Sequence, residues 1–232
     1  MTESLTIATP DGSFVAYVAR PSTQGPHPAI VVVQEIFGVN AVMRGIADAL
    51  AGQGFLAVAP DLFWRIEPGI DITDQSEAEW KRAFELFQAF DVEKGVEDIR
   101  ATLDAVRGRE DCSGKVGAVG YCLGGLLAFL TATRTDSDAS VSFYGVGIEN
   151  HVGEAERLAH PLMLHVAEED GFVPKPAQER IATALKNHPQ VTLHTYPGRN
   201  HAFARPGGEH FDAADAHLAN DRTLSFFKAH LA

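Results

Sequence analysis

Cys122 lies between two glycines in the run Gly120-Tyr121-Cys122-Leu123-Gly124, where one apolar segment ends and another begins. A nucleophile flanked by glycines at this spacing is the pattern of a nucleophile elbow, a sharp strand-to-helix turn that exposes a reactive side chain. Glycine is needed on both sides because a Cβ would collide with the opposite backbone. A cysteine among glycines can also be inert packing. The thiol therefore needs partners before it indicates catalysis.

Two loops further along the chain supply such partners. A nucleophilic thiol needs a base, and the base needs a group that orients it. His201 follows the last predicted strand, and Asp170 follows the strand before it. Both loops leave the carboxyl ends of strands, so we expect them at the same edge as Cys122. Glu168 and Glu169 compete with Asp170, which is favoured because it lies furthest into its loop.

Glu35 is the second unusual residue, because it directly follows the apolar run 29–33 and Gln34. A carboxylate at that depth is costly unless it has a partner. In elbow enzymes the loop after this strand lends a backbone N–H to the oxyanion hole. We therefore expect Glu35 near the thiol, although a salt-bridged or capping carboxylate is the alternative.

Composition limits the class of protein. The chain has 232 residues, 45% of them hydrophobic and 22% charged, which suits a single globular domain over residues 1–232. The net charge of −12 argues against nucleic acid and anionic membranes as partners. No apolar stretch reaches the roughly 20 residues that span a bilayer, and residues 1–4 do not resemble a signal peptide. We expect a cytoplasmic protein, with Cys112 and Cys122 as free thiols.

Strand and helix patterns alternate along the chain. This alternation predicts an α/β fold with a mainly parallel central sheet and helices on both faces. A short antiparallel hairpin is predicted at the start, around residues 10–12. The predicted strands are 4–8, 13–19, 29–33, 55–59, 116–121, 141–144, 162–166 and 191–196, and the predicted helices are 42–51, 76–90, 92–107, 123–134, 177–187 and 212–229.

No pattern of metal or cofactor binding is found in the sequence. His151 and His160 are nine residues apart, and nothing nearby completes a metal-ligand cluster. A glycine-rich phosphate loop is also missing. The sequence therefore predicts chemistry without a metal or a cofactor.

Together these motifs resemble the dienelactone hydrolase (carboxymethylenebutenolidase) family, whose members have the α/β-hydrolase fold and a cysteine nucleophile. The resemblance covers nearly the whole chain. The matching segments are Gln34-Glu35-Ile36-Phe37-Gly38-Val39-Asn40, Pro60-Asp61-Leu62, Gln88-Ala89-Phe90-Asp91, Val119-Gly120-Tyr121-Cys122-Leu123-Gly124-Gly125, Phe143-Tyr144-Gly145-Val146-Gly147 and His201-Ala202-Phe203-Ala204-Arg205.

The resemblance implies a role for each matching residue. Cys122 is the nucleophile, His201 the general base and then acid, and Asp170 the residue that orients His201. Glu35 is the carboxylate that takes the thiol proton when substrate binds. The backbone N–H groups of Leu123 and Ile36 form the oxyanion hole.

Substrate-binding residues follow from the same resemblance. Arg205 matches an arginine that pairs with the substrate carboxylate, a pairing that suits the planar guanidinium. A second family arginine is replaced by Trp80, and the nearest arginine, Arg82, points about 200° away round the helix. The pocket is thus expected to be more apolar than the family pattern, and the aromatic candidates on it are Trp80, Phe84, Phe87 and Phe37.

Together with these residues, the resemblance implies a hydrolase that opens a small, carboxylated lactone or activated ester through an acyl-enzyme on Cys122. A carboxylesterase for more apolar esters is the alternative, favoured by the aromatic residues. A redox-active thiol protein without esterase activity is a third hypothesis, which the Cys/His/Asp set argues against. The resemblance also implies a monomer.

Overall fold

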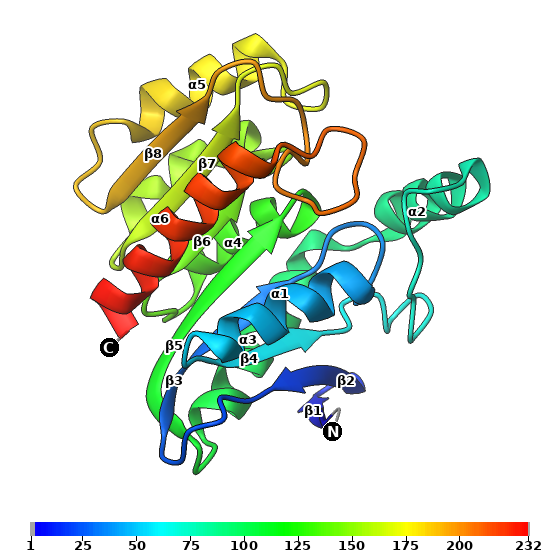
Figure 1. Ribbon diagram of the computed structural model, residues 1–232, viewed down its shortest axis with the longest axis vertical. Helices are drawn as coiled ribbons and strands as arrows, with labels where there is room; N and C mark the ends of the chain where they lie inside the picture. The colour runs from blue at the N-terminus through cyan, green and yellow to red at the C-terminus, as the bar shows by residue number, and fades with distance from the viewer. Residues whose placement is uncertain (1–2, 232) are drawn as a thin grey trace. The chain divides into compact units, whose positions relative to one another are not determined.

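The computed structural model describes residues 3–231, in which eight strands alternate with helices along most of the chain (Figure 1). The chain folds as two compact units, Met1–Ala118 and Val119–Ala232. Strand β5 (Cys112–Tyr121) begins in the first unit and ends in the second. The predicted mixed α/β class is confirmed.

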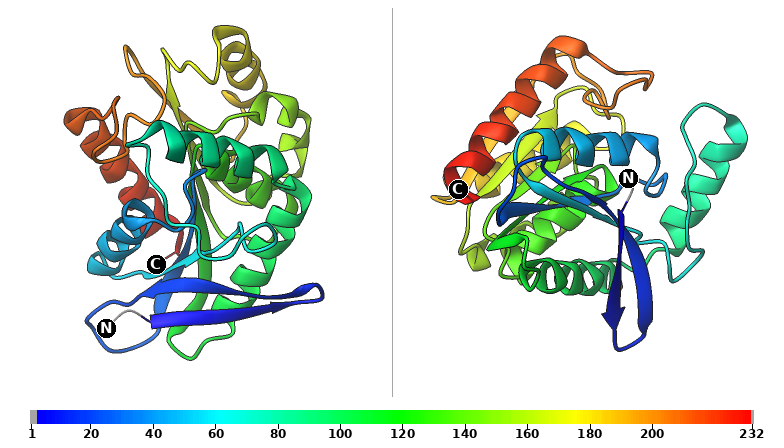
Figure 2. Two further views of the ribbon diagram at one scale, coloured as in Figure 1. Left: turned by 90° about the vertical axis from the view of Figure 1, so that its right-hand side faces the viewer. Right: turned by 60° about the horizontal axis from the view of Figure 1, so that its bottom comes forward.

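The first unit combines an antiparallel hairpin with a parallel strand pair. Strand β2 pairs antiparallel with both β1 and β4, whereas β3 and β4 are parallel. Helices α1 and α3 lie on opposite faces of β3 and β4 (Figure 1), and α2 stands apart from the strands of this unit (Figure 2). The elements are β1 (Glu3–Thr9), β2 (Gly12–Ala19), β3 (His27–Val33), α1 (Ala41–Gly52), β4 (Leu56–Pro60), α2 (Glu77–Ala89) and α3 (Val92–Arg107).

Local sequence explains where these elements begin. Residues 29–33 of β3 are fully buried, as expected for a parallel strand covered on both faces. Helix α1 begins after Asn40, whose side-chain oxygen accepts the N–H groups of residues 42 and 43. Helix α2 begins after Ser76, whose hydroxyl oxygen accepts the Glu79 N–H. The Glu79 carboxylate in turn binds the hydroxyls of Ser76 and Thr73.

The second unit is a parallel sheet with helices on both faces. Strand β7 pairs parallel with β6 and with β8, so their carboxyl ends share one edge. Helix α6 crosses one face of these strands and α4 lies on the other (Figure 1). The elements are α4 (Leu123–Arg134), β6 (Ser140–Phe143), the short 3₁₀ helices η1 (Ile148–Asn150) and η2 (Val152–Arg157), β7 (Leu162–Ala167), α5 (Lys175–Leu185), β8 (Val191–Tyr196) and α6 (Ala213–Leu231).

Helix α4 and His165 are buried in the core of the second unit. Every residue of α4 except its last, Arg134, is buried, so this helix has no solvent face. His165 on β7 is also fully buried. Its ring nitrogens bond the hydroxyls of Tyr196, at 2.8 Å, and Thr223, at 3.0 Å. Burial lowers the pKa of His165 well below 6.5, and it is therefore neutral at physiological pH.

Most sequence predictions of element position hold, and the exceptions have physical causes. The predicted helix 123–134 matches α4. The strand predicted to end at Tyr144 ends at Phe143, because Tyr144 has a φ of 38° and leaves the extended region. The helix predicted from 177 begins at Lys175, directly after Pro174. A single domain over 1–232 stays a prediction. No helix within residues 3–231 combines the length and apolar character that crossing a bilayer requires.

Candidate active site

Cys122 occupies a strained turn between β5 and α4. Its φ of 56° and ψ of −114° lie outside the regions that ordinary side chains prefer. Two glycines of this turn are required sterically. A Cβ on Gly120 would lie 1.8 Å from the Gly124 carbonyl oxygen, and one on Gly125 would lie 2.5 Å from that of Phe143. The predicted elbow is therefore formed, and strain of this kind typically marks a functional site.

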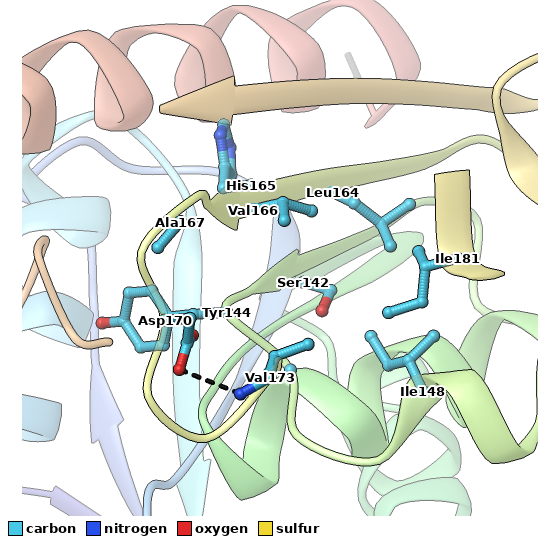
Figure 3. A pocket seen from close by; sticks show the side chains of 11 residues that line it. Ser142, Tyr144, Ile148, Leu164, His165, Val166, Ala167, Asp170, Val173 and Ile181 are labelled. Carbon is cyan, nitrogen blue, oxygen red and sulfur yellow. Dashed lines mark hydrogen bonds between the residues drawn. The ribbon is translucent and has the colours of Figure 1, made fainter. Parts of the chain in front are cut away.

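Asp170 and His201 are joined, as the sequence predicts. His201 Nδ1 lies 2.9 Å from one carboxylate oxygen of Asp170 and 3.1 Å from the other, and both side chains are buried. The Asp170 carboxylate also accepts the backbone N–H groups of Phe172, at 2.8 Å, and Val173, at 3.2 Å (Figure 3). These bonds fix the carboxylate and hold the imidazole in one tautomer.

His201 also interacts with Cys122. Burial disfavours the imidazolium, but the charge of the Cys122 thiolate and the hydrogen bonds to Asp170 and Cys122 outweigh it. They raise the pKa of His201 from 6.5 to about 10. With Cys122 as a thiolate, His201 is therefore an imidazolium at neutral pH. A thiolate beside an imidazolium is the reactive form of a cysteine nucleophile.

Two aromatic rings hold the imidazole, and sequence reasoning missed both. The rings of Tyr144 and Phe172 meet the His201 ring edge-on, at centroid distances of 5.1 and 4.8 Å. Tyr144 takes its left-handed conformation directly after β6, and it lines the same cavity as Asp170 (Figure 3). Phe172 stays 48% exposed, so one side of the imidazole is bordered by an accessible apolar surface. The sequence signal that could have indicated Tyr144 as a site residue is its aromatic side chain at the end of a predicted strand.

The cavity behind Asp170 is too small for a substrate. Its volume is about 10 Å³, roughly enough for one water molecule. Apolar side chains make up most of its lining (Figure 3), among them Ile148, Leu164, Val166 and Ile181. This cavity is therefore not a substrate site.

Arg205 and Leu123 are the other predicted site residues of the second unit. The Arg205 side chain is 9% exposed and packs over Gly208, where a Cβ would lie 2.9 Å from its Nε. Leu123 is the first residue of α4, so its N–H belongs to the first turn, which has no acceptor within the helix. Their roles toward substrate and oxyanion stay predictions.

Glu35 and Ile36 follow β3 in the first unit, as predicted. Glu35 is 1% exposed, so its carboxylate is buried. The neighbouring Gln34 is anchored, because its side-chain oxygen accepts the Leu62 N–H at 3.0 Å and its amide donates to the Glu35 carbonyl at 3.4 Å. The burial of Glu35 agrees with the depth expected from the sequence, and its role beside the thiol stays a prediction.

The aromatic candidates of the first unit cluster on one side of α2. Trp80 stacks on Phe84 at 5.5 Å and meets the edge of Phe37 at 5.1 Å. The Trp80 indole N–H donates to the Asp74 carbonyl, which fixes the ring. Phe87 is 37% exposed.

Arg82 is engaged elsewhere. Its guanidinium pairs with the carboxylates of Glu67 and Glu85. Two neighbouring anions neutralise it, so it is poorly suited to bind a substrate carboxylate.

Within residues 3–231, no group of three or more His, Cys, Asp or Glu side chains is arranged to hold a metal ion. Cys112 and Cys122 are both free thiols, as expected from their spacing.

The fold and these motifs define an α/β-hydrolase. The chain is similar to a putative dienelactone hydrolase structure from Klebsiella pneumoniae, with a TM-score of 0.85, 26% identity and 98% of each chain covered. The family model of dienelactone hydrolases matches residues 14–231. The chain belongs to the dienelactone hydrolase family.

Curated relatives match along the full length. A putative carboxymethylenebutenolidase of Azospirillum brasilense is 52% identical over 232 residues, covering all of both chains. A carboxymethylenebutenolidase of Pseudomonas putida is 42% identical over 227 residues, covering 97% of this chain and 96% of its own. A hydrolase acting on lactones or esters is therefore the class of this enzyme.

Proposed function

We propose that this enzyme opens a carboxylated lactone through a thioester on Cys122, with His201 and Asp170 as its partners. The observation that carries the proposal is the buried Asp170–His201 pair, whose imidazolium is stabilised beside the sulfur of a strained elbow. Names of full-length relatives support the lactone as substrate class.

In the first half of the reaction, the Cys122 thiolate attacks the lactone carbonyl and forms a C–S bond. The carbonyl oxygen becomes an oxyanion, for which the N–H groups of Leu123 and Ile36 are the proposed donors. Collapse of this intermediate breaks the ring C–O bond, and the leaving oxygen takes the proton of the His201 imidazolium. An enol lactone releases an enolate, which leaves more readily than an alkoxide.

In the second half, neutral His201 accepts a proton from water as the water oxygen attacks the thioester. The C–S bond breaks, the thiolate leaves, and the imidazolium is restored. Glu35 is proposed to take the thiol proton when substrate binds, as in the family, and to return it to the thiolate after the product leaves. Arg205 is proposed to bind the substrate carboxylate, and the monomeric state and cytoplasmic location stay proposals as well.

The test is the ultraviolet decay of a carboxylated dienelactone with the purified protein and with Cys122→Ala. We expect decay that the variant abolishes. Persistent decay in Cys122→Ala would contradict the cysteine mechanism, and no decay with the intact protein would retire this substrate.

The second candidate is a carboxylesterase for apolar esters, favoured by the ion pairs of Arg82 and the Trp80–Phe84 stack. Its test compares aryl esters with and without a carboxylate, using Trp80→Ala and the matched Arg82→Ala. If the aromatic cluster binds substrate, Trp80→Ala raises KM for neutral aryl esters several-fold and Arg82→Ala does not. Equal effects of the two variants would argue against this candidate.

A further inference from the structure

Asn200 links the two loops that carry the acid and the histidine. Its side-chain oxygen lies 3.0 Å from the backbone nitrogen of Gly171 and 2.7 Å from that of His201. Gly171 directly follows Asp170, and His201 directly follows Asn200 itself. One carbonyl oxygen thus accepts an N–H beside each member of the Asp170–His201 pair.

Chemistry fixes the orientation of this amide. Backbone N–H groups only donate, so two of them at hydrogen-bond distance require the oxygen of Asn200 and exclude its NH₂. The NH₂ points the other way, with Nδ2 3.3 Å from Nε2 of His210. His210 is exposed, so this second contact belongs to the surface.

Regular pairing between β7 and β8 ends before the two loops reach Asn200. Strands β7 and β8 pair as far as Ala167 and Tyr196. Past their ends, the Glu168 N–H bonds the Tyr196 carbonyl and the Glu169 N–H bonds the Arg199 carbonyl. The next link in the same direction is the Gly171 N–H to the Asn200 side chain. The side-chain oxygen of Asn200 therefore adds one more hydrogen bond between the two loops, next to Asp170 and His201.

The backbone after Asn200 is also strained. Ala202 has a φ of 61°, a conformation unfavourable for a residue with a Cβ. The Asn200–His201 bond lies directly before this turn and helps to anchor it, together with the bond from the Arg205 N–H to the Ala202 carbonyl. Loss of the anchor lets the turn relax and moves the imidazole relative to the carboxylate.

We propose that Asn200 is a positioning residue, whose carboxamide oxygen sets the distance between Asp170 and His201 and thereby the reactivity of Cys122. It acts through the backbone and does not touch the reacting atoms. The inference rests on the proposed function, but it is read out independently of any substrate through the thiol itself.

Four variants distinguish the role of the Asn200 side-chain oxygen, which accepts, from that of its NH₂, which donates. Asn200→Ala removes both, and Asn200→Gln keeps both but displaces them by one methylene. Asn200→Asp keeps an oxygen at the same place and loses the N–H to His210. His210→Ala removes only the partner of that N–H. Because Asn200 is partly exposed, all four variants are expected to fold, which thermal melting checks.

The first measurement is alkylation of Cys122 by iodoacetamide as a function of pH, followed by intact mass. Cys122→Ala corrects for Cys112. In Asn200→Ala and Asn200→Gln, we expect the pH midpoint of alkylation to rise, because a loosened Asp170 stabilises the imidazolium less. Asn200→Asp keeps the acceptor of both N–H groups and adds a negative charge beside His201, so its midpoint is expected not to rise above that of the parent protein. His210→Ala is expected to match the parent.

The second measurement is turnover of any lactone or ester that the protein hydrolyses. Misplacement of a catalytic group by about 1 Å can lower a rate by roughly 10²-fold. We expect a loss of kcat of roughly 10- to 100-fold in Asn200→Ala at nearly constant KM, with recovery in Asn200→Asp. An unchanged alkylation profile in Asn200→Ala, or equal losses in Asn200→Ala and Asn200→Asp, would overturn the proposal. If no ester is hydrolysed at all, the proposed function fails while the alkylation profiles still decide the role of Asn200.

Discussion

The neighbours of His201 raise its pKa in a direction that favours catalysis by Cys122. Burial alone would favour neutral imidazole, yet Cys122 and Asp170 together raise its pKa to about 10. The two partners act differently. Cys122 supplies a charge that exists only when the thiol is ionised, whereas Asp170 is fixed by two backbone N–H groups and by the ring itself.

Replacing Asp170 tests that division. Asp170→Asn keeps the shape but removes the charge, so the pKa of His201 falls and the thiolate loses support. We expect kcat to fall roughly 10⁴-fold, as for the equivalent change in a serine triad. The matched control is Glu169→Gln, because Glu169 is exposed and pairs with Lys175 at 3.1 Å. A loss in Glu169→Gln as large as in Asp170→Asn would mean that the orienting acid was misassigned.

At the scale of the elements, the turn that joins β5 to α4 and carries Cys122 tolerates few substitutions. In the elbow between β5 and α4, Gly120 and Gly125 have room for hydrogen only. By contrast, a Cβ added to Gly45 inside α1 would meet no heavy atom within 4 Å outside its own helix. The same substitution should therefore have opposite effects at the two places.

We expect Gly120→Ala to lower the free energy of unfolding by about 3 kcal/mol or more, since overpacking against backbone cannot be relieved by a side-chain rotation. Gly45→Ala should raise it by about 0.5–1 kcal/mol, because glycine disfavours a helix interior. Urea denaturation of both variants measures the difference. A stable Gly120→Ala protein with full activity would show that the elbow can relax.

Sequence reasoning located the elements better than their connections. Helix α4, the elbow and the strand ends that carry Asp170 and His201 were predictable, because glycine spacing and apolar periodicity are local signals. Asn200 was not, since its partner Gly171 is 29 residues away and only the folded backbone brings them together. The contact between Tyr144 and His201 was missed for the same reason. The family resemblance also gave no indication of the ion pairs of Arg82, whose partners are Glu67 and Glu85.

At the scale of the molecule, two buried histidines affect stability in opposite pH ranges. His201 has its pKa raised from 6.5 to about 10, so its own contribution to stability is fully present below pH 6.5 and is lost as the pH rises through about 10. His165 has its pKa lowered well below 6.5, so the unfolded state binds more protons below pH 6.5 and stability falls as the pH falls.

The contribution of these two histidines to the free energy of unfolding is therefore largest near pH 6.5, the ordinary pKa of histidine. Denaturation at a series of pH values measures it. His165→Gln should flatten the acid side, and Asp170→Asn should flatten the alkaline side by more than about 1.4 kcal/mol, the equivalent of one pKa unit. An alkaline side unaffected by Asp170→Asn would contradict the raised pKa of His201.

The burial of His165 has one more consequence. Because the ring is neutral and bonded to the hydroxyls of Tyr196 and Thr223, it carries a single N–H sealed inside the second unit. That proton should give a resolved downfield signal in ¹H NMR and exchange with D₂O only when the strands around β7 open. The exchange rate of this proton therefore measures how often this half of the protein opens.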